Sequence, residues 1–176
     1  MKPFVLILLI SFFSHANAAE LFGVNLANAS RDELRIAVKN SGVKLVQEAG
    51  IDAFYDIYKG GAVLHKAKHL YLGFVKKDKK FAFAEYEFIG LQQPGMLRKL
   101  NKKYGPAQRS KGKFMSDQSY SWLSNGIKIT FYQDWPAHKM RLTYVNPEAL
   151  KQLKRERQQF NINSSVKNAT YLEHAY

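Results

Sequence analysis

Hydrophobic and polar residues alternate most clearly in the second half of the chain. The segments 127–133 and 139–144 both alternate, and a third segment, 120–123, is rich in aromatic residues. A period of two places every second side chain on the same face of a strand. The Asn125-Gly126 pair between two of these segments favours the tight turn of a hairpin. The pattern predicts antiparallel strands with one buried face and one wet, basic face.

Three segments carry helix signals. Residues 30–33 (Ser-Arg-Asp-Glu) form a capping box, and the helix that it opens is expected to end at Gly42. Pro94 suits the first turn of a second helix, which Gly105-Pro106 would close. A third helix is expected from residue 146 onward, with a mostly polar circumference.

The remaining strand signals lie between the first two helices. Segments 43–48 and 53–59 are rich in β-branched and aromatic residues, and segments 70–76 and 81–88 flank a charged turn. Helices therefore alternate with groups of antiparallel strands. This order predicts an α+β fold, a two-layer helix-on-antiparallel-sheet domain over residues 19–159.

A short internal echo accompanies this order. Leu34-Arg35 precedes Gly42 at the same spacing at which Leu97-Arg98 precedes Gly105. Each of the two helices is followed by strands, which suggests a duplicated helix-plus-strands unit. Two shared positions and a glycine leave duplication and coincidence equally open.

The two ends of the chain lack the helix and strand patterns of the residues between them. Residues 1–18 have the form of a secretory signal peptide, because Lys2 is followed by an apolar run over 4–13 and by the Ala16-Asn17-Ala18 triplet. The run is too short for a helix across a bilayer, which needs about 20 residues, so no transmembrane segment is expected after cleavage. Residues 160–176 have no sustained period and are expected to form a flexible tail.

Composition narrows the class of protein. The chain has no cysteine, which excludes a disulfide-stapled miniprotein, a thiol enzyme and a zinc-thiolate module. A cysteine-free exported chain suits a bacterial protein that is periplasmic or secreted. The chain carries 27 Lys and Arg against 14 Asp and Glu, a net charge of +13, so it will be attracted to anionic polymers.

The second half of the chain resembles a known group of proteins. A helix that ends in Gly105-Pro106 is followed by aromatic strands that include 121–123, 126–129 and 142–144. In this it is similar to small bacterial envelope proteins of the BamE/SmpA type and to the beta-lactamase-inhibitor-protein-like fold. The resemblance implies a helix-on-sheet module that binds other proteins and catalyses nothing. The lipidated cysteine of BamE is absent here, so anchoring in the outer membrane is not implied.

The candidates for catalysis are few. His65 and His69 are spaced as two ligands of a metal could be, but two lysines lie between them and no third ligand is evident. Glu85 and Glu87 would share one face of a strand and could act as an acid and a base. These four residues are the only support for a metal- or carboxylate-dependent hydrolase, which we rank third. We expect no catalytic residues, no metal and no cofactor, and hence no enzyme.

Basic side chains form two clusters that could bind anions. One lies in the charged turn and the other on the second helix; together they comprise Lys76, Lys77, Lys79, Lys80, Arg98, Lys99, Lys102 and Lys103. Export makes lipopolysaccharide, acidic glycans or lipid headgroups the available ligands, and nucleic acid is not expected. The alternative is a solvated basic surface that binds nothing specific.

An aromatic and basic patch is the leading candidate for a partner site. Trp135 lies in a turn and is expected to be exposed, and Tyr132, Lys139 and Arg141 should lie near it on the wet face of the sheet. The leading hypothesis is an exported, non-catalytic module that contacts an envelope protein through this surface. Binding of an anionic envelope ligand is the alternative. The sequence does not identify the partner.

Overall fold

The computed structural model describes residues 18–50, 54–62, 64, 66–89, 94–111, 118–134 and 139–173. Three features of the sequence lie outside these residues: His65, Trp135 and the predicted signal peptide apart from Ala18. Within the described part of the chain, no helix is both long enough and apolar enough to cross a membrane.

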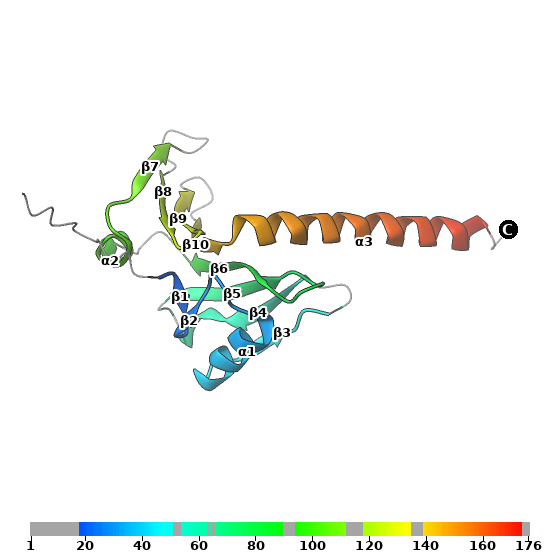
Figure 1. The fold of residues 1–176 in the computed structure, drawn as a ribbon, viewed down its shortest axis with the longest axis horizontal. Coiled ribbons are helices and arrows are strands. Elements are labelled where there is room, and N and C mark those ends of the chain that lie inside the picture. Colours follow the sequence, from blue (N-terminus) through cyan, green and yellow to red (C-terminus); the bar gives the residue numbers. More distant parts are fainter. Residues whose placement is uncertain are drawn as a thin grey trace, which may run out of the picture.

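The described chain forms three helices and two antiparallel sheets (Figure 1). A two-stranded sheet of β1 and β2 comes first, and the other eight strands form one sheet in the order β3-β4-β5-β6-β10-β9-β8-β7. The helices are α1 (Arg31–Asn40), α2 (Pro94–Tyr104) and α3 (Pro147–Glu173), with a 3-10 turn at Gly60–Ala62. The strands are β1 (Glu20–Leu21), β2 (Val24–Asn25), β3 (Leu45–Gln47), β4 (Tyr55–Lys59), β5 (Ala67–Phe74), β6 (Phe81–Ile89), β7 (Gln108–Lys111), β8 (Gln118–Ser124), β9 (Ile127–Asp134) and β10 (Lys139–Val145). The predicted α+β class is confirmed.

The strand order contains a repeat. Helix α1 is followed by β3 to β6 and helix α2 by β7 to β10, and within each group every strand pairs with its neighbour in sequence. The two groups join where β6 pairs antiparallel with β10. Gly42 and Gly105 follow the two helices with φ of 72° and 85°, a conformation that favours glycine. The echo in the sequence thus coincides with a helix-then-strands unit that occurs twice.

Both of these helices cover the same face of the sheet. Leu34 and Val38 of α1 and Met96 and Leu100 of α2 belong to one buried cluster with the strands. The predicted alternation is confirmed, because the hydrophobic residues at even positions of β10 and odd positions of β9 are buried: Met140, Leu142, Tyr144, Ile127, Ile129 and Phe131. Helix α1 lies below the sheet in Figure 1.

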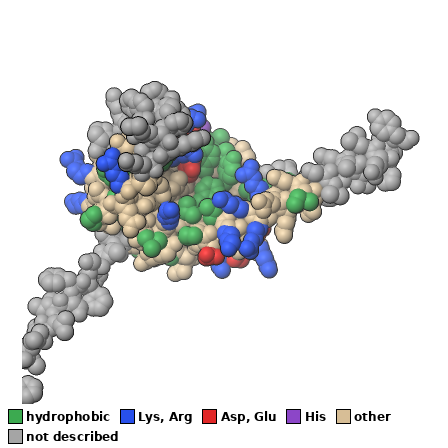
Figure 2. Space-filling model, turned by 90° about the horizontal axis from the view of Figure 1, so that it is seen from above, with side chains coloured by type: hydrophobic (Ala, Val, Ile, Leu, Met, Phe, Trp, Pro, Cys, Tyr) green, Lys and Arg blue, Asp and Glu red, His purple; other side chains and the backbone are tan. Residues whose placement is uncertain are grey.

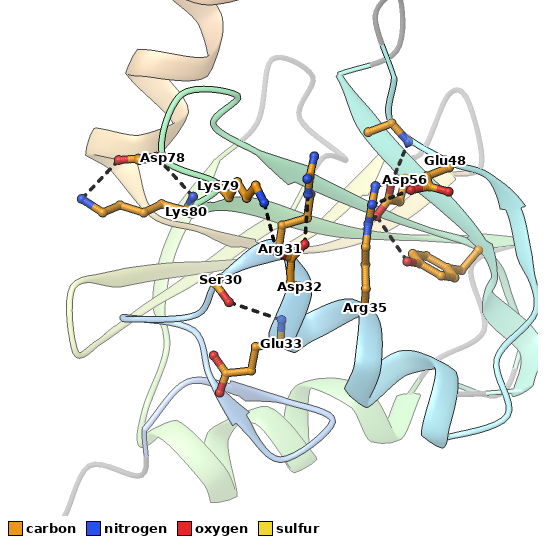
Figure 3. A network of polar contacts seen from close by, with 12 residues as sticks. Ser30, Arg31, Asp32, Glu33, Arg35, Glu48, Asp56, Asp78, Lys79 and Lys80 are labelled. Atoms are coloured by element: carbon orange, nitrogen blue, oxygen red, sulfur yellow. Dashed lines mark hydrogen bonds and ion pairs between the residues drawn. The ribbon is translucent and has the colours of Figure 1, made fainter.

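A buried ion pair fastens α1 to the sheet (Figure 3). The guanidinium of Arg35 donates from Nε and Nη2 to the two carboxylate oxygens of Asp56 on β4, over 2.8 and 2.7 Å. Asp56 is fully buried and also accepts the backbone N–H of Ala49 (2.6 Å) and the hydroxyl of Tyr58 (3.2 Å). Without these hydrogen bonds, burial of the Asp56 carboxylate would be strongly unfavourable in free energy.

The start of α1 follows the sequence prediction. The hydroxyl of Ser30 accepts the backbone N–H of Glu33 over 3.3 Å, as the predicted capping box requires. The neighbouring Asp32 accepts a hydrogen bond from Lys79 in the turn between β5 and β6. This turn therefore lies beside the first turn of α1.

Helix α3 runs further than the sequence analysis predicted. It continues through Phe160 to Glu173 without interruption, because no glycine or proline follows Pro147 within it. The ring of Phe160 packs edge-on against Phe54 with centroids 5.7 Å apart, so this residue of α3 contacts the strand region. Beyond Phe160 the helix projects away from the sheet (Figure 1). The flexibility of residues 160–176 stays a prediction.

One edge strand was not predicted. After Gly105-Pro106, β7 (Gln-Arg-Ser-Lys) pairs with β8 at the edge of the sheet. An edge strand needs no buried face, so its composition is polar and carries no hydrophobic alternation. The signal on which strand prediction depends is absent there.

Candidate binding face of the sheet

The face of the large sheet away from α1 and α2 is only partly buried. On β6, the residues Phe83, Glu85 and Glu87 alternate with the buried Ala84 and Tyr86. Strand register places the corresponding side chains of the neighbouring strands beside them. We call this surface the open face; its residues on the central strands are Tyr55, Ile57, His69, Tyr71, Phe83, Glu85, Glu87, Thr130, Tyr132, Arg141 and Thr143.

The open face is seen from above in Figure 2. Hydrophobic side chains, which include tyrosines, gather in the middle of this view, and acidic and histidine side chains lie beside them. Helix α3 covers one end of the face, where its buried residues Ala149 and Leu153 belong to a hydrophobic cluster against which Tyr55 and Phe83 pack. The rest of the described face is accessible to solvent.

A hydrogen-bonded cluster lies on β5 and β6. The hydroxyl of Tyr71 donates to Oε2 of Glu87 over 3.2 Å and lies 3.3 Å from Nδ1 of His69. Nδ1 of His69 is itself 3.5 Å from the same carboxylate oxygen. The prediction that Glu85 and Glu87 share one face is confirmed, and their side-chain partners include Arg141 for Glu85 and His69 and Tyr71 for Glu87.

The two glutamates have opposite electrostatic surroundings. Burial raises the pKa of Glu85 above its usual value, and Glu87 raises it further, while Arg141, 3.8 Å away, only partly offsets this. Burial acts in the same direction on Glu87, but the hydrogen bonds of His69 and Tyr71 outweigh it, so the pKa of Glu87 is lowered. Burial, together with Glu87, raises the pKa of Tyr71 to about 12, so its phenol remains a neutral donor at neutral pH.

We expect these two carboxyl groups to titrate in a fixed order. As pH rises, Glu87 should lose its proton below pH 4.5 and Glu85 above it. Because the pKa of Glu85 in the folded protein lies above 4.5, its ionisation destabilises the fold as pH rises from 4.5 through that folded pKa. Because the pKa of Glu87 in the folded protein lies below 4.5, this residue stabilises the fold above pH 4.5, and that stability is lost on acidification. An NMR titration of the carboxyl carbon shifts measures both pKa values. A pKa of Glu87 above that of Glu85 would contradict this electrostatic account.

A pocket lies beside this cluster. It has a volume of about 320 Å³ and is lined by Tyr55, Tyr71, Phe83 and Glu85, from three adjacent strands. Gly73 of β5 makes room for the ring of Phe83, because a Cβ at that position would clash with Cε1 of this ring. The ring of Phe83 therefore lies across β5 and approaches Tyr55, with centroids 6.3 Å apart.

The predicted partner residues are brought together in part. Tyr132 and Arg141 are directly paired across β9 and β10 and are half-buried on the open face, and Lys139 is exposed at the start of β10. Trp135, the centre of the prediction, lies outside the described residues. The sequence analysis missed the pocket, since nothing in a single strand reveals which residues from three strands will meet.

The first basic cluster is partly engaged within the protein. Lys79 bonds Asp32 (3.2 Å), Lys80 bonds Asp78 (3.2 Å), and the ammonium of Lys76 lies 4.3 Å from the ring centre of Phe54. The backbone N–H of Lys76 also donates to Glu156 of α3 over 2.8 Å, and that of Lys77 to the same carboxylate over 3.4 Å. These contacts give the turn a structural role.

The second basic cluster is exposed on α2. Arg98, Lys99, Lys102 and Lys103 all face solvent, with Lys103 5.3 Å from the ring centre of Tyr104. Helix α2 follows β6, whereas the turn with the first cluster precedes it. The two clusters therefore lie at opposite ends of β6 in the chain, as two separate groups.

Metal-ligating side chains do not cluster in the part of the chain that the structure describes. No three His, Asp or Glu residues there are close enough to hold an ion, and His65 falls outside it. The arrangement on the open face offers hydrogen bonds, charge and aromatic surface.

Comparisons with known proteins give a distant structural neighbour. No protein-family profile and no curated protein match the chain. A crystal structure of a DUF4309 family protein (YjgB) from Bacillus subtilis is similar to 69% of this chain and 82% of its own, with 14% identity and a TM-score of 0.41.

Proposed function

We propose that this protein is an exported, non-catalytic binding module that contacts an envelope protein through its open face. The observation that carries the proposal is the contrast between the two faces of one sheet. The face toward α1 and α2 is buried, while the open face keeps aromatic rings and charged groups accessible to solvent.

The composition of the open face supports a protein partner. Tyrosine and arginine are enriched at the energetic centres of protein interfaces. Tyr132 and Arg141 lie on neighbouring strands here, and Tyr71 lies on β5 of the same face.

The alternative function is binding of an anionic envelope ligand by the basic clusters. It receives less support, because lysines of the first cluster bond Asp32 and Asp78 and the second cluster lies on another element. The two functions differ in salt dependence. Ligand binding by surface charge weakens steeply with salt, whereas a packed interface loses little.

A crosslinking pull-down from the cell envelope fraction tests the proposal. The purified protein should retain one discrete protein through a high-salt wash. The variant Tyr132→Ala/Arg141→Ala should lose it, because two central contacts of the open face are removed. Truncating such interface residues costs about 1–2 kcal/mol or more each, so retention should fall at least about tenfold.

The matched control is Lys99→Ala/Lys102→Ala on α2, which removes exposed charge from the other side of the protein. It should retain the partner fully. Retention that survives the open-face substitutions but is lost with the α2 substitutions or with salt would contradict the proposal and support anion binding. Circular dichroism and unfolding midpoints establish that both variants are folded.

A further inference from the structure

We infer that the pocket lined by Tyr55, Tyr71, Phe83 and Glu85 receives a positively charged side chain, lysine or arginine, from the protein partner. This inference rests on the proposed function, since it names the group that the open face recognises. It concerns a site that the sequence analysis did not identify.

Three aromatic rings form the walls of the pocket. Tyr55 meets Tyr71 with centroids 5.7 Å apart and planes inclined at 80°, and it meets Phe83 at 6.3 Å and 64°. Both pairs are T-shaped, so the edge of one ring packs against the face of the other, and the remaining ring surface lines an open hollow. A cation within about 6 Å of ring faces is attracted by their quadrupoles, which is the physical basis of aromatic cages for ammonium groups.

Glu85 forms the fourth wall of the pocket, and its negative charge is only partly neutralised by nearby positive charge. Glu85 is mostly buried, and its charged neighbour Arg141 lies 3.8 Å away, near the limit for an ion pair, with a side chain 43% exposed. Burial raises the pKa of Glu85, so the site disfavours its charged form. A cation that enters the pocket would offset this cost.

Two carboxylates lie at this site. Glu87 follows Glu85 on the same face, and its pKa is lowered, so the carboxylate is ionised at neutral pH. Arg141 beside Glu85 and Lys59 opposite His69 offset part of this negative charge. A basic side chain is attracted by the two carboxylates at short range.

Size also favours a side chain over a larger molecule. The volume of about 320 Å³ lies at the lower end of the range for small-molecule sites, roughly 300–1,000 Å³. The aliphatic stem of lysine or arginine can pack against the rings while the charged end reaches Glu85.

NMR titration of the purified protein tests the inference directly. The probes are the Nα-acetyl methylamides of arginine, lysine and norleucine, where norleucine keeps the stem and lacks the charge. Arginine and lysine should give saturable shifts of the Tyr55, Tyr71 and Phe83 ring signals, and norleucine should bind at least about tenfold more weakly because the charged contact is missing. Equal binding of norleucine, or shifts elsewhere on the protein, would overturn the inference.

Two variants localise the effect. Glu85→Gln should weaken arginine binding about tenfold, whereas Glu148→Gln, an exposed glutamate on α3, should leave it unchanged. Gly73→Ala should displace the ring of Phe83 and abolish binding by reshaping the pocket while leaving Glu85 in place. Arginine binding that persists in both Glu85→Gln and Gly73→Ala would place the cation elsewhere and overturn the inference.

The pull-down separates this inference from the proposed function. Partner retention that is lost in Tyr132→Ala/Arg141→Ala and unchanged in Glu85→Gln supports the proposed function and overturns the cation pocket. Retention that is unchanged in all open-face variants overturns both. Loss in both the double variant and Glu85→Gln supports both.

Discussion

Replacing Asp56 with alanine is expected to lower the free energy of unfolding by about 3–5 kcal/mol, the range for removing one partner of a buried ion pair. Asp56 is fully buried and accepts two hydrogen bonds from Arg35, one from the backbone of Ala49 and one from Tyr58. Its loss leaves the Arg35 guanidinium against β4 with only Glu48 as a charged partner. Urea unfolding followed by circular dichroism measures the change.

Glu48 provides the matched control. It also pairs with Arg35, but its side chain is 58% exposed, so Glu48→Gln should cost less than about 1 kcal/mol. Similar losses for the Asp56 and Glu48 variants would contradict the view that the buried half of this network holds α1 on the sheet.

Replacing Trp122 with alanine should also cost about 3–5 kcal/mol, as expected for a large buried aromatic residue. Trp122 as a whole residue is 5% exposed. Its indole N–H donates to the carbonyl of Gly105, just after α2, over 2.9 Å. Trp122→Phe keeps most of the packing but leaves that carbonyl without its donor, so its expected cost is about 1–3 kcal/mol. Chemical denaturation of the two variants measures both values.

The adjacent residue gives the comparison. Leu123 points to the other face of β8 and is 73% exposed, so Leu123→Ala should change stability by no more than about 0.5 kcal/mol. A Trp122→Ala loss as small as that of Leu123→Ala would show that the contact between β8 and the end of α2 does not hold the second helix in place.

The hydrophobic pattern predicted the second half of the sheet better than the first. In β9 and β10 the apolar positions alternate strictly, and those are the buried ones. In β4 the buried positions are Asp56 and Tyr58, while Tyr55 and Ile57 lie on the open face. Hydrophobicity alone favours the opposite orientation, because the partner that permits Asp56 to be buried, Arg35, lies on a distant helix.

The repeated Leu-Arg and glycine spacing predicted the repeated order of helix and strands, but it did not predict which residues join each helix to the sheet. Arg35 and Arg98 occupy the same position relative to the glycine that follows each helix. Arg35 forms the buried ion pair with Asp56, whereas Arg98 faces solvent and α2 is instead joined to β8 through Trp122. Equivalent backbone positions thus carry different interactions in the two halves.

The candidate site was predictable only within single strands. The spacing of Glu85 and Glu87 predicted one shared face on their strand, and the alternation around Tyr132 and Arg141 predicted another wet face, and only the pairing of β6 with β10 joins the two. The pocket depends on Gly73 and on the register of three strands, and register is set by tertiary pairing. A glycine opposite a phenylalanine is visible only once the strands are paired.

Site-specific photocrosslinking in the cell envelope tests the open-face interface most directly. A photoreactive residue replaces Thr143, at the centre of the open face, or Ile36, which is 62% exposed on α1 on the opposite side of the sheet. We predict one discrete protein adduct from position 143, resistant to high salt, and none from position 36. An adduct from position 36 with none from position 143 would contradict the assignment of the open face as the binding surface.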